Sequence, residues 1–146
     1  MLKKISMKQL KWIFIIFLMV GFSQFGVAQS QLSKKQAVKF ENLGAKDFYE
    51  KLQQTPEAQL IDVRTPVEYR QGHLPHAVLI NYYDRNFAAN LEKAGFDKNK
   101  PVFIYCRSGH RSGNARKIFL KLGFSHVINL VHGINEWYQL NLPIEK

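Results

Sequence analysis

The stretch PVFIYCRSGHRSG, at residues 101–113, runs from an apolar segment into a loop rich in Gly and Arg. Residues 101–106 have the composition of a fully buried central β-strand. The only cysteine of the chain, Cys106, ends this run, and Gly109 and Gly113 permit a tight path after it. A helical pattern then starts near Ser112, with apolar residues at helical spacing: Ala115, Ile118, Phe119 and Leu122. We therefore predict a buried strand, a short loop and a helix in direct succession.

Short apolar runs and helical patterns alternate along the chain after residue 39. The strand-like runs are 58–64, 76–82, 101–106 and 126–130, and the helical patterns cover 45–52, 87–94, 115–122 and 134–138. Glycines at the ends of two of these patterns, Gly95 and Gly123, indicate helix termini. Strands separated by helices predict an α/β fold, with a mostly parallel sheet covered by helices on both faces. In such a sheet ligands bind at the carboxyl ends of strands, which is where Cys106 lies.

The first 28 residues are basic, then apolar, then small, which is the order of a secretory signal peptide. The apolar run over 12–22 is well short of the roughly 20 residues that a membrane-spanning helix needs. We expect cleavage after Ala28, a polar tether over 29–39 and one domain over 40–146. The protein is then expected to be exported to the periplasm and to keep no stable membrane span. An uncleaved signal anchor stays open as the alternative.

The cysteine content and the net charge of the chain limit the kind of protein that it can be. The chain has 146 residues, one cysteine and a formal net charge of +10. A single cysteine cannot form an internal disulfide, so in an exported protein it indicates an intermolecular bond or a reactive thiol. The basic excess can steer anions toward a site. The sequence has no basic stripe with interleaved aromatic residues, and we expect no nucleic-acid partner.

The loop after the strand has the features of an anion cradle around a reactive thiol. Its backbone N–H groups and the following helix N-terminus face the position of Cys106. We expect this helix end, together with Arg107 and Arg111, to lower the pKa of the thiol and make it nucleophilic at neutral pH. The alternative is an inert buried cysteine next to surface arginines.

Three segments of the chain resemble the signatures of the rhodanese domain, in its single-domain, exported bacterial form. CRSGHRS at 106–112 resembles the active-site loop, LIDVRTPVEYRQGHLPHA at 60–77 the first signature, and GFSHVINLVHGINEW at 123–137 the closing one. The resemblance covers about residues 40–144. It implies a rhodanese-like fold, with a parallel five-stranded central sheet and helices on both faces.

The resemblance also implies a thiosulfate sulfurtransferase with Cys106 as the catalytic residue. Its thiolate would take the outer sulfur of thiosulfate or a related anionic donor, and the resulting persulfide would pass that sulfur to a thiol or to cyanide. The substrate-binding residues would be those of the loop: Arg107, Ser108, Gly109, His110, Arg111 and Ser112. No metal or organic cofactor is implied.

The spacing within the loop separates this chain from cysteine-dependent phosphatases. Those enzymes, and the phosphatase relatives of the rhodanese fold, have five residues between Cys and Arg, whereas here four residues separate Cys106 from Arg111. A phosphatase or arsenate reductase is disfavoured for this reason. A non-catalytic module that binds sulfur or docks a partner remains the alternative to an enzyme.

We expect several residues outside the loop to have supporting roles. Asp62 and Arg64 match the family's Asp-Val-Arg, and two interpretations stay open: Asp62 holds a loop arginine, or the two form a strand-end ion pair. Glu68 is expected to complete a capping box begun by Thr65, so its role is structural. His73 is expected to pack and form hydrogen bonds rather than bind a metal.

Two histidines depart from the family pattern. His76 and His132 stand where glycines are usual, and glycine often marks a positive φ. These changes put the local turn geometry in doubt rather than the chemistry. His73 and His76 are close in sequence, yet they lack a nearby carboxylate or second cysteine to complete a metal site.

Overall fold

The computed structural model describes residues 38–146, so the expected signal peptide and nearly all of the expected tether lie outside the described residues. The strands are β1 (Lys39–Leu43), β2 (Gln59–Asp62), β3 (Val78–Leu79), β4 (Val102–Tyr105) and β5 (His126–Leu130). The helices are α3 (Ala45–Gln53), α4 (Pro66–Arg70), α5 (Phe87–Lys93), α6 (His110–Lys121) and α7 (Gly133–Gln139). Within these residues no helix has the length and apolar character needed to cross a membrane.

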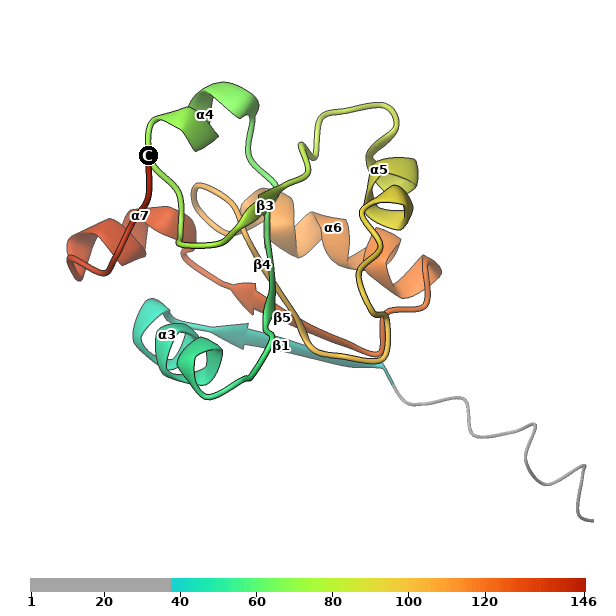
Figure 1. Cartoon of the computed structure of the whole chain (residues 1–146), viewed down its shortest axis with the longest axis horizontal. Coiled ribbons are helices and arrows are strands. Elements are labelled where there is room, and N and C mark those ends of the chain that lie inside the picture. Colours follow the sequence, from blue (N-terminus) through green and yellow to red (C-terminus); the bar gives the residue numbers. More distant parts are fainter. Residues whose placement is uncertain (1–37) are drawn as a thin grey trace, which may run out of the picture. The chain divides into compact units, whose positions relative to one another are not determined.

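The five strands form one sheet in the order β1-β5-β4-β2-β3, and every pair is parallel. Figure 1 shows α3 and α7 on one side of this sheet and α5 and α6 on the other, as the buried contacts require. The predicted fold, a parallel five-stranded sheet with helices on both faces, is therefore confirmed. β4 is central, and its four residues are all buried.

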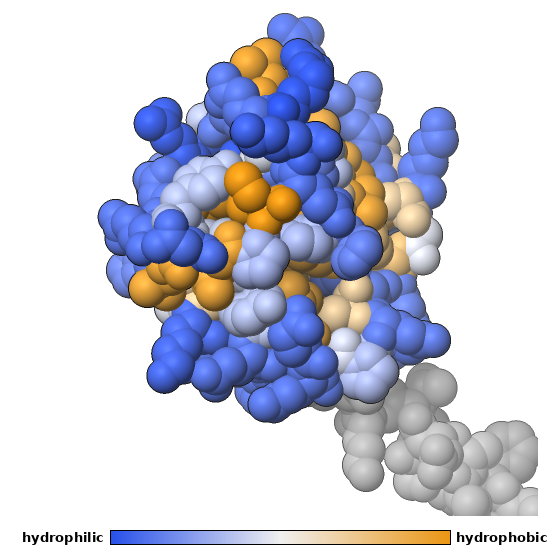
Figure 2. Space-filling view, turned by 60° about the vertical axis from the view of Figure 1, so that its left-hand side comes forward, coloured by the Kyte–Doolittle hydropathy of each residue, from blue (hydrophilic) through white to orange (hydrophobic). Residues whose placement is uncertain are grey.

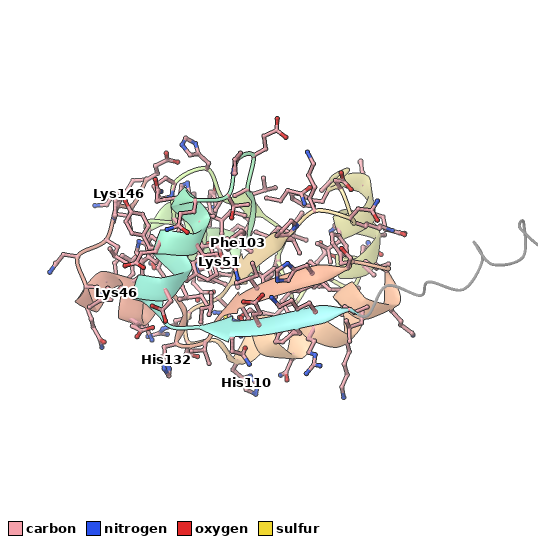
Figure 3. The ribbon with its side chains drawn as sticks, turned by 90° about the horizontal axis from the view of Figure 1, so that it is seen from below. Lys46, Lys51, Phe103, His110, His132 and Lys146 are labelled. Carbon is pink, nitrogen blue, oxygen red and sulfur yellow. The ribbon has the colours of Figure 1, made fainter. Side chains whose placement is uncertain are left out.

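The alternation of side chains along β4 divides the core into two halves. Val102 and Ile104 pack toward α5 and α6, whereas Phe103 and Tyr105 pack toward α3 and α7. Successive side chains of a strand point to opposite faces, so one apolar run supplies both halves. In Figure 3 Phe103 lies inside the molecule near α3, where its ring meets that of Phe48 edge to face at 5.2 Å.

The structure differs from the sequence-based expectation at two elements. β1 was not predicted from its residues, and Lys39, the last residue of the expected tether, already pairs with His126 of β5. No side chain of β1 is fully buried, so the strand has little of the apolar pattern that identifies the others. Helix α6 begins at His110 rather than near Ser112, because Gly109 takes a left-handed conformation (φ 86°) that turns the chain directly into the helix.

Candidate active site

Cys106 follows β4 directly and lies at the carboxyl edge of the sheet, where the sequence predicted it. Its side chain is only 1% exposed. The sulfur accepts a hydrogen bond from the backbone N–H of Gly109 at 3.1 Å and one from the hydroxyl of Ser112 at 3.5 Å. The loop therefore closes around the sulfur within one turn, and the first turn of α6 contributes directly to the site.

The pKa of the Cys106 thiol is lowered from its ordinary value, although burial raises it. The causes that outweigh burial are hydrogen bonds to the sulfur from the Ser112 side chain and from the backbone N–H groups of Ser108, Arg111 and Ser112. Hydrogen bonding to the charged form favours that form. The expected effect of the helix end is present, since Arg111 and Ser112 lie in the first turn of α6, whereas the arginine side chains are not among the main causes of the lowered pKa.

Arg111 does not face the sulfur as a free cation, since it is bound by Glu68 of α4. The two guanidinium nitrogens donate to the two carboxylate oxygens at 2.8 and 2.6 Å. This paired, partly buried geometry is the strong form of an Arg–carboxylate contact. It lowers the pKa of Glu68 to about 2, chiefly through the hydrogen bonds from Arg111 against the cost of burial.

Glu68 therefore has two roles, of which the sequence indicated one. The expected capping box is present, because Glu68 accepts from the backbone of Thr65 at 3.0 Å while the Thr65 hydroxyl accepts from the backbone of Glu68. The same carboxylate holds the Cys loop through Arg111. Nothing in the sequence marks this second contact, because the two residues lie 43 positions apart.

Asp62 and Arg64 form a buried ion pair with each other, and Asp62 holds no loop arginine. The Arg64 Nη2 atom donates to the Asp62 carboxylate at 2.7 Å and to the carbonyl of Gly72 at 2.7 Å. Of the two interpretations left open, the strand-end ion pair is correct. The Arg64 side chain is 4% exposed and that of Asp62 is 0% exposed. Because Arg64 also donates to Gly72, this buried pair fixes the end of β2 to the turn after α4.

The turn between β5 and α7 packs against the Cys loop at very short range. A Cβ atom on Gly109 would lie 1.7 Å from the carbonyl oxygen of Val131, and one on Gly133 would lie 2.4 Å from the carbonyl carbon of Arg107. The backbone N–H of Ile134 donates to the carbonyl of Cys106 at 2.9 Å. Both glycines have positive φ, and neither position leaves room for a side chain. The third signature is therefore the support of the loop.

The remaining loop residues divide by exposure. Arg107, Ser108 and His110 are exposed, while Gly109 and Ser112 are buried. His110 lies within 3.4–3.5 Å of the side chain of Asn114 rather than near the sulfur. Figure 3 shows His110 and His132 projecting outward from the same edge of the molecule.

The histidines that stand in place of glycines differ in backbone conformation. His76 has a φ of 64°, so it carries the strain that the glycine pattern suggested, whereas His132 has a φ of −103°. His73 stacks on the ring of Tyr69 and its Nδ1 lies 3.1 Å from the Tyr69 carbonyl, which is the packing role expected of it. Across residues 38–146 no three His, Cys, Asp or Glu side chains gather in a way that could hold a metal ion.

Among the cavities on the described part of the chain, two adjoin α7. The larger, of 420 Å³, is lined by residues of α3 and α7 and by the turn that carries His76. Figure 2 brings the side of α3 and α7 forward and shows apolar residues surfacing there among hydrophilic ones. The smaller, of 280 Å³, adjoins the Cys loop at Arg107 and is lined mainly by polar side chains of α4 and α7.

Several sulfurtransferases are similar to this chain in sequence. A sulfurtransferase of Allochromatium vinosum is 32% identical over 102 residues, which cover 70% of this chain and 92% of that protein. The thiosulfate sulfurtransferase PspE of Escherichia coli is 39% identical over 69 residues, covering 47% of this chain and 64% of that protein.

Solved structures share the architecture. A polysulfide-sulfur transferase homodimer from Wolinella succinogenes is 30% identical and superposes with a TM-score of 0.61 over 85% of this chain and 89% of that one. A rhodanese-like domain protein from Staphylococcus aureus is 28% identical, with a TM-score of 0.60 over 75% of this chain and 100% of that one. Residues 45–140 match the family described as "Rhodanese-like domain". With this match over β2 to β5, the helices and the Cys loop, the chain belongs to the rhodanese-like domain family.

Proposed function

We propose that this protein is a sulfurtransferase that carries sulfane sulfur as a persulfide on Cys106. The observation that supports this most strongly is the sulfur itself, buried at the end of the central strand with hydrogen-bond donors from Gly109 and Ser112 and with its pKa lowered. Relatives named thiosulfate sulfurtransferase and thiosulfate:glutathione sulfurtransferase, at 39% and 31% identity, support the same chemistry.

The proposed reaction has two displacements. The Cys106 thiolate attacks the outer sulfur of thiosulfate, the S–S bond of thiosulfate breaks, and sulfite leaves with the electron pair. A thiolate acceptor then attacks the terminal sulfur of the persulfide, and the Cys106 thiolate is released. The reaction is thus ping-pong, and the lowered pKa of Cys106 increases the fraction of the nucleophilic thiolate. Cyanide can serve as the acceptor in an assay.

Loop residues outside Cys106 are proposed to bind and orient the donor. Arg107 is exposed at the start of the loop and can attract an anion. Ser108, Gly109 and Ser112 present N–H or O–H groups toward the sulfur, and these would stabilise the negative terminal sulfur of a persulfide. Arg111, tied to Glu68, is proposed to keep the loop in shape, and exposed His110 to flank its entrance.

The first experiment is intact mass spectrometry of the purified protein before and after thiosulfate, with Cys106→Ser as the comparison. We expect the native protein alone to gain one sulfur atom, and cyanide to remove it with release of thiocyanate. If a protein with a free, reduced thiol gains no sulfur, the sulfurtransferase proposal fails in favour of a non-catalytic docking module. Hydrolysis of an aryl phosphate would instead revive the phosphatase alternative.

We also propose that the protein is exported to the periplasm after cleavage behind Ala28. This rests on the order of basic, apolar and small residues over 1–28. N-terminal sequencing of protein recovered from the periplasmic fraction should begin at Gln29. A sequence beginning at Met1 would instead indicate that the signal is not cleaved.

A further inference from the structure

We propose that the 280 Å³ cavity beside the Cys loop binds the sulfur acceptor, and that this acceptor is a small thiol that carries a carboxylate. The inference rests on the proposed sulfur transfer and specifies its second substrate. The cavity lies between α4 and α7 and begins at Arg107, the residue after Cys106. Its volume is just below the range of about 300–1,000 Å³ that is usual for small-molecule sites.

The charges around the cavity leave one cation without a partner. Arg64 lines the cavity but is bound to Asp62, and Glu68 lines it but is bound to Arg111. Among residues 38–146, no acidic side chain comes within ion-pair distance of Arg107. The cavity therefore has the charge balance of an anion site, and a guanidinium group binds a carboxylate with two parallel hydrogen bonds.

The neutral polar groups of the cavity are available to a ligand. Gln71, at the end of α4, and Asn135, in the first turn of α7, are exposed, and their side-chain amides have no hydrogen-bond partner in the described part of the chain. Tyr138 donates its hydroxyl proton to the carbonyl of Gly72 at 3.2 Å, so its oxygen remains an acceptor. Two free amides and a phenol beside a cation suit a carboxylate-bearing or peptide-like thiol better than an apolar one.

The cavity is rigidly connected to the reacting sulfur. The backbone N–H groups of Ile134 and Asn135 donate to the carbonyls of Cys106 and Arg107, at 2.9 and 3.2 Å. The first turn of α7 is thus fixed to the residues that begin the loop. A thiol whose carboxylate is held by Arg107 and whose remaining polar groups contact Gln71 and Asn135 is brought up to the Cys loop. Its thiolate then attacks the terminal sulfur of the persulfide, a new S–S bond forms on the acceptor, and Cys106 leaves as the thiolate.

Binding can be tested without turnover, which separates this inference from the proposed function. ¹⁵N-labelled protein is titrated with S-methylglutathione, which cannot accept sulfur, and with its dimethyl ester. We expect the side-chain amide signals of Gln71 and Asn135 to shift with the acid, and the ester to bind about tenfold more weakly. Asn135→Leu should weaken binding of the acid, whereas Gln139→Leu, at an exposed amide at the end of the same helix, should not. Equal binding of acid and ester, or shifts confined to other residues, would overturn the inference.

Turnover provides the second measurement. After loading with thiosulfate, the protein is given 3-mercaptopropionate or 2-mercaptoethanol, two thiols of similar length of which only the first has a carboxylate. We expect a higher kcat/KM for the carboxylate thiol, and a loss of this preference, by about tenfold and mainly through KM, in Arg107→Met. A preference that survives Arg107→Met would exclude the cavity as the acceptor site even if the persulfide forms normally.

Discussion

Replacing Glu68 by Gln tests whether the contact between α4 and the Cys loop is an energetic support of the site. Glutamine is also accepted at the third position of a capping box, so it can keep the hydrogen bond from the backbone of Thr65. What it removes is the negative charge that binds both guanidinium nitrogens of Arg111 at 2.8 and 2.6 Å. The substitution therefore isolates the ion pair from the helix cap.

The size of the effect follows from the pKa of Glu68. This pKa falls from an ordinary 4.5 to about 2. The shift corresponds to at most about 3 kcal/mol of folding stability from the contacts of the ionised carboxylate. The side chain of Arg111 is 13% exposed and that of Glu68 is 23% exposed. Solvent screening therefore reduces the expected loss in the free energy of unfolding to about 1–2 kcal/mol. Because the folded-state pKa is the lower one, this contribution is complete above pH 4.5 and is lost as the pH falls toward 2.

The assay is urea unfolding of the native and Glu68→Gln proteins at pH 7 and near pH 2.5, followed by tryptophan fluorescence. We expect Glu68→Gln to lower the free energy of unfolding by about 1–2 kcal/mol at pH 7 and to have a clearly smaller effect near pH 2.5, where most of the contribution has been lost. Glu92→Gln, which removes an exposed surface pair with Lys98, serves as the matched control and should change little at either pH. An equal loss at both pH values, or none at pH 7, would refute the reasoning.

Further predictions concern the cradle of the thiol and the turn that supports it. Ser112→Ala removes the hydroxyl donor to Cys106 and should raise the pKa of the thiol. Alkylation of the thiol by iodoacetamide at pH 7 should therefore slow. An unchanged pH profile of alkylation would contradict this prediction. Gly109→Ala places a Cβ 1.7 Å from the carbonyl oxygen of Val131 and should cost on the order of 4 kcal/mol, which a loss of soluble or cooperatively unfolding protein would report. The control is Gly95→Ala, because Gly95 has a similar positive φ but a Cβ there would meet no atom within 4 Å. This substitution should lower the free energy of unfolding by only about 1–2 kcal/mol. Comparable losses at both positions would mean that the close approach of Val131 to Gly109 is unimportant.

Elements with a strong local pattern were predictable. The run HVINL was predicted as a strand over 126–130, and β5 has those bounds. Buried parallel strands are almost entirely apolar, so their composition alone identifies them. β1 was missed for the opposite reason: it lies at the edge of the sheet, none of its side chains is fully buried, and its pairing with β5 is made through the backbone.

The sequence by itself determined the alternation of strands and helices and the position of Cys106 at the start of a glycine-rich loop. These features depend on residues close together in the chain, where periodicity and turn chemistry act. Only the tertiary structure decided which groups act on the loop. It joined Glu68 to Arg111, paired Asp62 with Arg64 instead of a loop arginine, and left Arg107 facing a polar cavity. Such pairings depend on how helices pack around the sheet, and many charged residues of this chain carry the same local signal, so spacing in the sequence cannot select among them.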